Sequence, residues 1–211
     1  MTKLPFQGIR VADFGWVITA PLATLWLATL GAEVIKVETK AYPETFRRIA
    51  HGGMADGVIG PNRGGGFSSL NYSKYSCSLD LRKPRARELA REIIKTSDVV
   101  VEALTNPVLE RYELTYEQVK QVKPDVVMLS VSSLGKTGPL RNATGYGPSN
   151  QAYAGLPSMT GYEGSLGANI GGTWPDYWMG IVTTYLLTLA LYHRRRTGQG
   201  ILIDLSMVEG V

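Results

Sequence analysis

The sequence is poor in the residues that most often bind metals or form cross-links, because its 211 residues include one cysteine and two histidines. A single cysteine, Cys77, excludes an intrachain disulfide, so a reducing cytoplasm is the expected compartment. The N-terminus lacks a basic segment followed by an apolar run, which argues against secretion. His51 lies in a glycine-rich loop and His193 near a helix end, and neither has a neighbour that predicts a metal ligand or a base.

Long apolar runs are missing too. The longest, Tyr177 to Tyr192, contains three threonines and is shorter than the ~20 residues that cross a bilayer, so it predicts a helix buried in a protein core. The net charge of +4 is modest, and the basic residues lack the aromatic interleaving of a nucleic-acid surface. We therefore expect no membrane span and no nucleic-acid partner, and small anions as ligands.

A dinucleotide fingerprint is absent as well. Ile9–Phe14 and Glu33–Glu38 predict two parallel strands joined by a helix from Pro21 to about Leu30. A NAD-binding unit would carry G-x-G-x-x-G after the first strand, whereas this chain has DFGWVITAP there. Glu38 ends the second strand, where a ribose contact could lie, but without the glycines we do not expect bound NAD.

The remaining segments continue the alternation of strands and helices. They predict an α/β fold, a Rossmann-like open parallel sheet with helices on both faces, whose ligands bind at the carboxyl ends of the strands. The segment from Thr39 to Ser69 is irregular, and its triple glycine predicts a flexible lid, because no helix start is expected directly after it. The further strands are expected at Cys77–Leu81, Val99–Glu102, Val126–Val131 and Ile201–Leu205, and the helices at Pro84 to about Thr96, from Pro107, at Tyr116–Val122, from Pro175 to His193 and from Ser206.

Asp176 is the candidate catalytic residue. It follows Pro175 in the first turn of the long helix, where free backbone N–H groups and the helix dipole favour an ionised carboxylate. We therefore predict that Asp176 is charged, has a low pKa, points into a space lined by loops and acts as a nucleophile. The alternative is that Asp176 only caps the helix.

Seven segments, in order, resemble the N-terminal half of the family III CoA-transferases. The resemblance implies that residues 1–211 are the N-terminal part of a Rossmann-like, CoA-binding large domain, and that a C-terminal small domain is missing from this chain. It also implies that Asp176 is the catalytic nucleophile. The segments are LPFQGIRVADFGWV, LGAEVIKVE, LNYSKYSCSLDLRKP, SDVVVEAL, SSLGKTGP, PDYWMG and RRRTGQGILIDLSMVEG.

The same resemblance implies that coenzyme A is a substrate lying across the strand-end loops, with no permanently bound cofactor. Arg111 matches an arginine that reaches a CoA phosphate. Thr39 stands where the family often has arginine, so Lys40, Arg47 or Arg48 is expected to supply that cation. The implied CoA contacts are Val17, Ile18, Leu79, Asp80, Leu81, Arg82, Ala103, Leu104, Thr105, Arg111, Gly145 and Tyr146.

The resemblance further implies transfer of CoA from an acyl-CoA donor to a carboxylate through an acyl-aspartyl anhydride and an aspartyl-CoA thioester. Trp16, Trp174, Tyr177 and Trp178 are expected near the site and favour a bulky or aromatic acceptor such as benzylsuccinate, with succinyl-CoA as donor. The alternative for these aromatics is the protein core. Family members form intertwined dimers, so we expect a dimer of identical or homologous chains with Asp176 near the interface.

Two other functions remain open. A 2-methylacyl-CoA racemase-like isomerase shares SMVEG, but its base comes from a Gly-His-Asp turn where this chain has Gly145-Tyr146-Gly147. Tyrosine, with an unperturbed pKa near ~10, is a poor base at neutral pH. The second alternative is a non-catalytic acyl-CoA-binding subunit of a heteromeric transferase. The carboxylate at Asp176 argues against that role.

Overall fold

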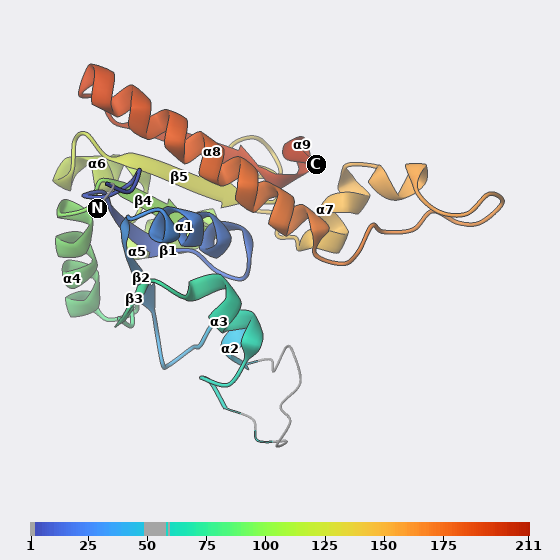
Figure 1. Ribbon diagram of the computed structural model, residues 1–211, viewed down its shortest axis with the longest axis horizontal. Coiled ribbons are helices and arrows are strands. Elements are labelled where there is room, and N and C mark those ends of the chain that lie inside the picture. The colour runs from blue at the N-terminus through green and yellow to red at the C-terminus, as the bar shows by residue number, and fades with distance from the viewer. Residues whose placement is uncertain (1–2, 49–57, 59) are drawn as a thin grey trace.

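The computed structural model describes residues 3–48, 58 and 60–211, and its centre is a six-stranded parallel sheet in the order β3-β2-β1-β4-β5-β6 (Figure 1). This is the doubly wound order, so the predicted Rossmann-like sheet is confirmed. The order reverses between β1 and β4, where a crevice is expected. The strands are β1 (Arg10–Phe14), β2 (Glu33–Glu38), β3 (Tyr75–Ser78), β4 (Val99–Glu102), β5 (Val127–Ser132) and β6 (Ile201–Ser206).

Helices cover both faces of this sheet (Figure 1). The long helix α8 and α1 pack together over one face, while α4, α5 and α6 cover the other. The described helices are α1 (Thr19–Thr29), α2 (Thr45–Arg48), α3 (Gly65–Asn71), α4 (Pro84–Lys95), α5 (Asn106–Tyr112), α6 (Tyr116–Val122), α7 (Gly147–Tyr153), the 3-10 turn η1 (Leu156–Met159), α8 (Trp174–Thr197) and α9 (Met207–Gly210).

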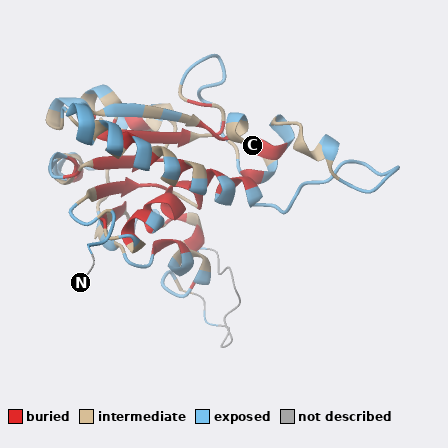
Figure 2. Ribbon diagram, turned by 45° about the horizontal axis from the view of Figure 1, so that its top comes forward, coloured by how far each residue is buried: buried red, intermediate tan, exposed pale blue. Residues whose placement is uncertain are grey.

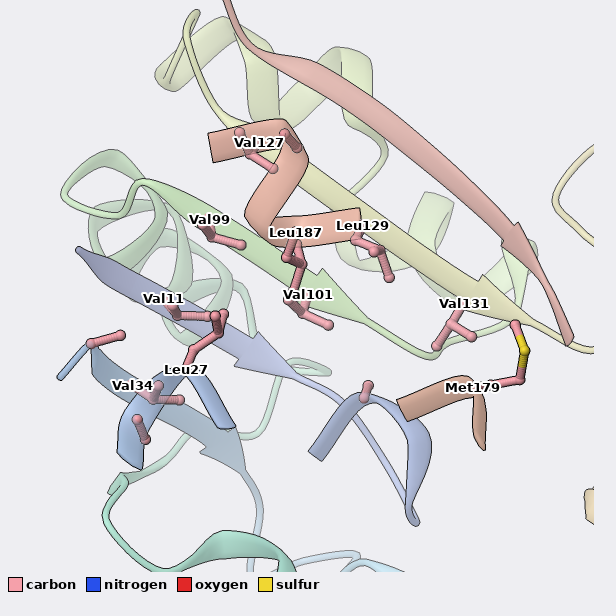
Figure 3. Packing of buried hydrophobic residues seen from close by; sticks show 14 of the residues in the cluster. Val11, Leu27, Val34, Val99, Val101, Val127, Leu129, Val131, Met179 and Leu187 are labelled. Atoms are coloured by element: carbon pink, nitrogen blue, oxygen red, sulfur yellow. The ribbon is translucent and has the colours of Figure 1, made fainter. Parts of the chain in front are cut away.

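The core is divided by the sheet into two apolar clusters. Along β4, Val99 and Val101 face the layer of α1 and α8, whereas Val100 faces the opposite layer. Figure 3 shows Val99 and Val101 directed toward Leu187 of α8. Because both faces are covered, the central strands β1, β4 and β5 are apolar at most positions, as expected for buried parallel strands.

Two details differ from the sequence-based expectation. Strand β3 is Tyr75–Ser78 instead of Cys77–Leu81, because it pairs with β2 from Ile35↔Tyr75 to Glu38↔Ser78 and ends where β2 ends. The second detail is the triple glycine, where Gly64 is the N-cap of α3. The expectation that no helix starts there was therefore wrong. His51 and the glycine pair at 52–53 lie outside the described residues.

Helix α8 buries one side only. Met179, Thr183 and Leu187 are fully buried, whereas Ile181 and Tyr185 on the outer side are 54% and 62% exposed. The expected burial in a protein core therefore holds for one side of α8 within this chain. The segment between η1 and α8 extends away from the body of the molecule, and its exposed residues appear pale blue in Figure 2. No helix among the described residues is long and apolar enough to cross a membrane.

Candidate functional site

A cavity of about 570 Å³ opens at the carboxyl ends of the strands. Its walls are the loops that follow β1, β2, β3, β4 and β5, and Asp176 of α8 and Met207 of α9 also line it. These loops meet at the point where the strand order reverses, which is the usual ligand position in an open α/β sheet. The fold therefore brings together short segments that are far apart in the sequence.

Asp176 is held in this cavity by contacts from three parts of the chain. Its own N–H donates to the carbonyl oxygen of Thr173 at 3.1 Å, in the first turn of α8. The Thr19 hydroxyl, from the start of α1, donates to the Asp176 carbonyl oxygen at 3.2 Å. The Gly147 N–H donates to the Asp176 carboxylate, and a Cβ at position 147 would overlap Oδ2 of Asp176. Glycine at 147 thus allows α7 to begin directly against the carboxylate.

The electrostatics of Asp176 differ from the sequence-based expectation. Burial raises its pKa to about 6, and its own N–H and that of Gly147 only partly oppose the shift. The predicted low pKa was wrong, because the side chain is withdrawn from water and the residue is 7% exposed. The carboxylate is still mostly ionised at pH 7, as a nucleophile must be. A perturbed carboxyl group inside a cavity is also typical of functional sites.

Most of the residues expected to contact CoA do line this cavity, but two do not. Ile18 is 1% exposed and packs among Leu22 and Leu25. Arg111 is exposed on α5 and does not belong to the cavity wall. Contacts from these two residues to CoA stay a prediction without support from their position. The expected residues that line the cavity are Val17, Leu79, Asp80, Leu81, Arg82, Ala103, Leu104, Thr105, Gly145 and Tyr146.

Three cations line the cavity, and the sequence reasoning named only Arg82. Arg82 forms two hydrogen bonds of 2.8 Å with Asp80. Lys136 and Arg141 are the cations that were missed. They could have been recognised from their position in the loop after β5, since such loops bind ligands in this kind of sheet. Anionic groups of a ligand would meet these three side chains.

The three residues proposed to replace the missing arginine do not line the cavity. Arg47 instead binds both carboxylate oxygens of Glu38, at 2.6 and 2.8 Å. Burial works to raise the pKa of Glu38, but the hydrogen bonds from Arg47 and Ser76 lower it overall. The guanidinium of Arg48 lies 4.8 Å from the ring centre of Tyr42, and Lys40 is exposed. Glu38 is thus occupied by protein groups in the position where a NAD ribose was considered.

Lys136 also ties two walls of the cavity together. Its Nζ lies 3.3 Å from Oε1 of Glu102 and donates to the carbonyl oxygen of Leu104. Glu102 is 1% exposed and accepts a 2.6 Å hydrogen bond from the Leu104 N–H. Burial raises the pKa of Glu102, and the nearby Lys136 opposes this shift. The ammonium group therefore fastens the loop after β4 to the loop after β5.

The aromatic residues of the cavity wall differ from those expected: besides Trp16 they are Phe14, Tyr42, Tyr112 and Tyr146. Trp16 and Tyr42 line it and stack with ring centres 5.6 Å apart. Trp174 and Trp178 stack on each other at 6.4 Å but lie outside the cavity wall, as does Tyr177. These three residues lie next to Asp176 in α8 but do not line the cavity, because successive positions of a helix start point in different directions.

The chemistry of the wall limits what this site can do. No histidine is found among the described residues that line the cavity, and Tyr146, at the turn where a racemase carries its histidine, is 66% exposed. Within the described part of the chain, no group of three His, Cys, Asp or Glu side chains could hold a metal ion. The arrangement instead offers one desolvated carboxylate, a set of cations and backbone N–H groups.

Comparisons with known proteins agree with this geometry. A family described as CoA-transferase family III matches residues 6–211. The chain is 31% identical over 214 residues to the succinate–glutarate CoA-transferase of Agrobacterium fabrum, covering 98% of this chain and 52% of that protein. It is 32% identical over 213 residues to the succinyl-CoA–L-malate CoA-transferase beta subunit of Chloroflexus aurantiacus, covering 100% and 51%.

The fold is also similar to that of a solved structure. The crystal structure of a CAIB/BAIF family protein from Brucella suis superposes with a TM-score of 0.90 at 28% identity, covering 99% of this chain and 55% of that one. This chain therefore spans about half the length of the proteins that it matches.

Proposed function

Because the chain belongs to family III of the CoA-transferases, we propose that the complete protein moves coenzyme A from an acyl-CoA to a carboxylic acid, with Asp176 as the nucleophile. The observation that carries this proposal is the nearly buried Asp176 carboxylate, which lines the cavity together with loops that carry cations. A helix cap alone does not require a carboxylate that burial has shifted to a pKa of about 6. The carboxylate therefore has the environment of a reacting group.

In the first step, a carboxylate oxygen of Asp176 attacks the thioester carbonyl carbon of the donor and expels CoA thiolate, which leaves an acyl-aspartyl anhydride. The thiolate attacks the aspartyl carbonyl carbon, the donor acid leaves, and an aspartyl-CoA thioester forms. The acceptor carboxylate then attacks this thioester, giving a second anhydride and thiolate. Attack of the thiolate on the acceptor carbonyl carbon releases the new acyl-CoA and restores the carboxylate of Asp176.

The residues of this chain have three tasks in this scheme. Gly147 N–H holds the Asp176 carboxylate in position. Arg82, Lys136 and Arg141 attract the phosphate groups of CoA and the acid that exchanges with it. Backbone N–H groups near the start of α8 are the natural donors for the oxyanion that each step develops, and one such donor contributes ~3 kcal/mol. No step requires a permanently bound cofactor.

For the substrates, we propose succinyl-CoA as donor and a dicarboxylic acid as acceptor. The two relatives above are named for succinate, glutarate and malate. The Trp16–Tyr42 stack gives the cavity an aromatic wall, and this supports an acceptor with an aromatic substituent such as benzylsuccinate. The decisive measurement compares turnover with benzylsuccinate, succinate, malate, glutarate and oxalate. A marked preference for oxalate over every larger acid would contradict the proposed wall.

The two alternatives predict different chemistry. A racemase would exchange the α-proton of an acyl-CoA with solvent deuterium in the absence of an acceptor, and the cavity supplies no histidine among its described residues. A binding subunit would form no covalent adduct.

As assembly, we propose an intertwined dimer of identical or homologous chains, which the beta-subunit relative supports. A cytoplasmic location stays a prediction from the single cysteine.

The test of the proposed function is to trap the intermediate. The complete protein is incubated with succinyl-CoA and treated with hydroxylamine or borohydride, and the peptide covering residues 171–194 is analysed by mass spectrometry. We expect a modification of Asp176 that depends on the donor and is lost in Asp176→Ala together with turnover. A complete Asp176→Ala protein with normal turnover, or a donor-treated protein without any adduct at Asp176, would reject the nucleophile assignment.

A further inference from the structure

Four charged side chains are buried next to the loop that joins β1 to α1, outside the cavity wall. They are Asp13, Lys36, Glu44 and Lys74, and each side chain is at most 2% exposed. Nζ of Lys74 lies 3.0 Å from Oδ2 of Asp13, and Nζ of Lys36 lies 3.7 Å from Oε2 of Glu44. Burying such ions costs several kcal/mol each, and apolar residues of similar size would often be equally stable. Stability alone therefore does not account for this charge cluster.

The charge cluster holds Gly15 from both sides. Oδ1 of Asp13 accepts a hydrogen bond from the Gly15 N–H at 2.8 Å. Nζ of Lys36 donates to the Gly15 carbonyl oxygen, also at 2.8 Å. Asp13 and Lys36 are register partners on the neighbouring strands β1 and β2, so their spacing is fixed by the sheet. A Cβ at position 15 would lie 2.6 Å from Cβ of Ala20, so the backbone has no freedom to move in that direction.

The residues after Gly15 form the cavity wall and reach Asp176. Trp16 and Val17 both line the cavity. Val17 has a φ of 65°, a left-handed backbone conformation that is strained for a β-branched residue. Two residues later, the Thr19 hydroxyl donates to the carbonyl oxygen of Asp176. Strain of this kind persists only where the surroundings impose it, and Val17 lies between two such constraints, the hold on Gly15 and the burial of Ile18.

Lys74 extends this hold to the helices around the loop. Its ammonium group donates to Oδ2 of Asp13, to the Pro21 carbonyl oxygen and to Thr24 Oγ1 at 3.0, 2.8 and 2.8 Å, and also to Asn71 Oδ1 at 2.9 Å. Thr24 itself donates to Oδ2 of Asp13 at 2.6 Å. One lysine thus connects β1, α1 and α3.

Glu44 connects the charge cluster to Tyr42, a second aromatic residue of the cavity wall. It lies two residues after Tyr42, whose ring stacks on Trp16. Its contact with Lys36 therefore couples the segment before α2 to the loop after β1. The charge cluster is therefore connected to both stacked rings of the cavity wall, to Trp16 through Gly15 and to Tyr42 through Glu44.

We propose that the charge cluster of Asp13, Lys36, Glu44 and Lys74 is a positioning device for the transfer reaction. It holds the Gly15–Val17 backbone, including the strained Val17, in one conformation against the start of α8. The thioester carbonyl carbon is thereby placed within reach of the Asp176 carboxylate. This inference rests on the proposed function, and it assigns these four residues an effect on the rate of attack with little effect on CoA affinity.

The charge cluster also gives the reaction an alkaline limit. Burial lowers the pKa of Lys74 to about 8, although Asp13 raises it, Lys36 adds to the lowering and Glu44 opposes it. The polar neighbours from the packed helices are Thr24 and Asn71. In Asp13, burial works to raise the pKa, but Lys74 and Lys36 lower it overall, so this carboxylate stays ionised. Above pH 8, the Asp13 carboxylate therefore loses the charge of its ion-pair partner Lys74 and keeps only that of Lys36.

The experiment uses the complete protein and four variants: Lys74→Met, Val17→Gly, the double variant that carries both changes, and Lys95→Met as a control at an exposed position of α4. We expect Lys74→Met to lower kcat by about 10- to 100-fold, as misplacement of reacting groups by about 1 Å does. KM for the acyl-CoA donor should stay nearly unchanged. Lys95→Met should behave as the wild-type protein.

The double-mutant cycle separates positioning from a general loss of structure. Glycine adopts a φ of 65° freely, so Val17→Gly removes the strain that the charge cluster maintains. The loss of kcat caused by Lys74→Met should therefore be smaller in the Val17→Gly background. Equal losses in both backgrounds, or a folded Lys74→Met with wild-type kcat, would overturn the proposal.

The wild-type protein provides a test that does not depend on any variant folding. Its kcat should fall as pH rises through about 8, with an unchanged far-UV circular dichroism spectrum, and a flat profile from pH 7 to about 9.5 would also overturn the proposal. Adduct formation at Asp176 keeps the two proposals apart. No adduct in the wild-type protein rejects the proposed function, whereas equally fast adduct formation in Lys74→Met rejects only the positioning role.

Discussion

Asp176 carries a charge that opposes folding, and this can be measured. Its pKa in the folded protein is raised from 3.8 to about 6 by burial. The folded state therefore binds the proton more tightly than the unfolded chain does, so the stability contributed by this group is complete below pH 4 and is lost as pH rises through 6. At neutral pH, the ionised carboxylate costs at most about 3 kcal/mol, from a shift of about two pKa units.

We predict that Asp176→Asn makes the complete protein inactive but more stable at pH 7–8, since the amide has no charge to desolvate and its oxygen can still accept from Gly147 N–H. The gain should shrink toward zero at pH 4. Chemical denaturation at both pH values measures it. A variant that is less stable than the wild type at pH 8 would show that the carboxylate is stabilised by its surroundings.

Gly147 is the second residue whose identity the site requires. A Cβ at this position would overlap Oδ2 of Asp176 and lie 2.6 Å from the carbonyl oxygen of Gly172. Gly147→Ala should therefore displace the carboxylate and lower kcat by about 100-fold, while KM for the donor changes little. Gly172→Ala is the matched control, because a Cβ there meets nothing within 4 Å. Steady-state kinetics of both variants decide the point, and equal activities would remove Gly147 from the site.

At the scale of elements, α8 connects the carboxyl ends of the strands to their amino ends. Asp176 lies in its first turn at the cavity, and Arg194 lies in its last turn, beside the amino ends of β4 and β5. Nη1 of Arg194 is 2.8 Å from Oδ1 of Asp98, and its Nε is 2.9 Å from Oδ2 of Asp125. These two carboxylates precede β4 and β5, so one guanidinium fixes the far end of the helix to the central strands.

We predict that Arg194→Met lowers the free energy of unfolding by roughly 1–2 kcal/mol, below the full effect of a buried ion pair because Asp125 is partly exposed to solvent. The kcat of the folded protein should not change, because ~18 residues of helix, about 27 Å, separate Arg194 from Asp176. Urea denaturation and kinetics check the two parts, with the exposed Arg195→Met as the control. A change in kcat without a change in stability would mean that the far end of α8 acts on the site directly.

Most elements followed from local sequence patterns, and the failures have a common physical cause. Glu33–Glu38 and Tyr116–Val122 were predicted with the observed bounds, because apolar spacing and capping residues act over a few positions. Strand β3 was displaced, since its ends are set by its partner β2. Ile18 is buried by residues of α1, α2 and α3, and the raised pKa of Asp176 comes from burial where α7 and α8 meet, so neither follows from a local pattern.

The position of the site was predicted better than the identity of the basic residues that line it. The loops lining the cavity were identified because parallel strands gather their carboxyl ends at one edge. Whether a basic side chain lines the cavity depends on the acidic residue with which it forms an ion pair. Arg47 was wrongly considered as a phosphate-binding residue, because its ion pair with Glu38 cannot be recognised from their spacing in the sequence. Lys136 was missed for the same reason, since its contact with Glu102 joins two loops that are distant in sequence.

At the scale of the whole molecule, the apolar outer side of α8 requires a covering. Tyr185, Leu189 and Tyr192 are 62%, 46% and 59% exposed along one side of a single helix, together with Ile181. An exposed apolar stripe of this length marks a contact surface. The chain spans about half the length of the relatives that it matches, and we propose that this side of α8 is covered in the complete protein.

We predict that the complete protein is an intertwined dimer, in which this side of α8 is buried and Asp176 lies near the interface. Size-exclusion chromatography with light scattering should give twice the mass of one complete chain. Tyr185→Glu should disrupt this dimer, because a carboxylate buried without a partner costs several kcal/mol, whereas Lys95→Glu, exposed on α4 at the opposite face of the sheet, should leave it intact. Shared sites would make activity fall together with the dimer. A stable monomer that retained full turnover would contradict both the assembly and the sharing of the site.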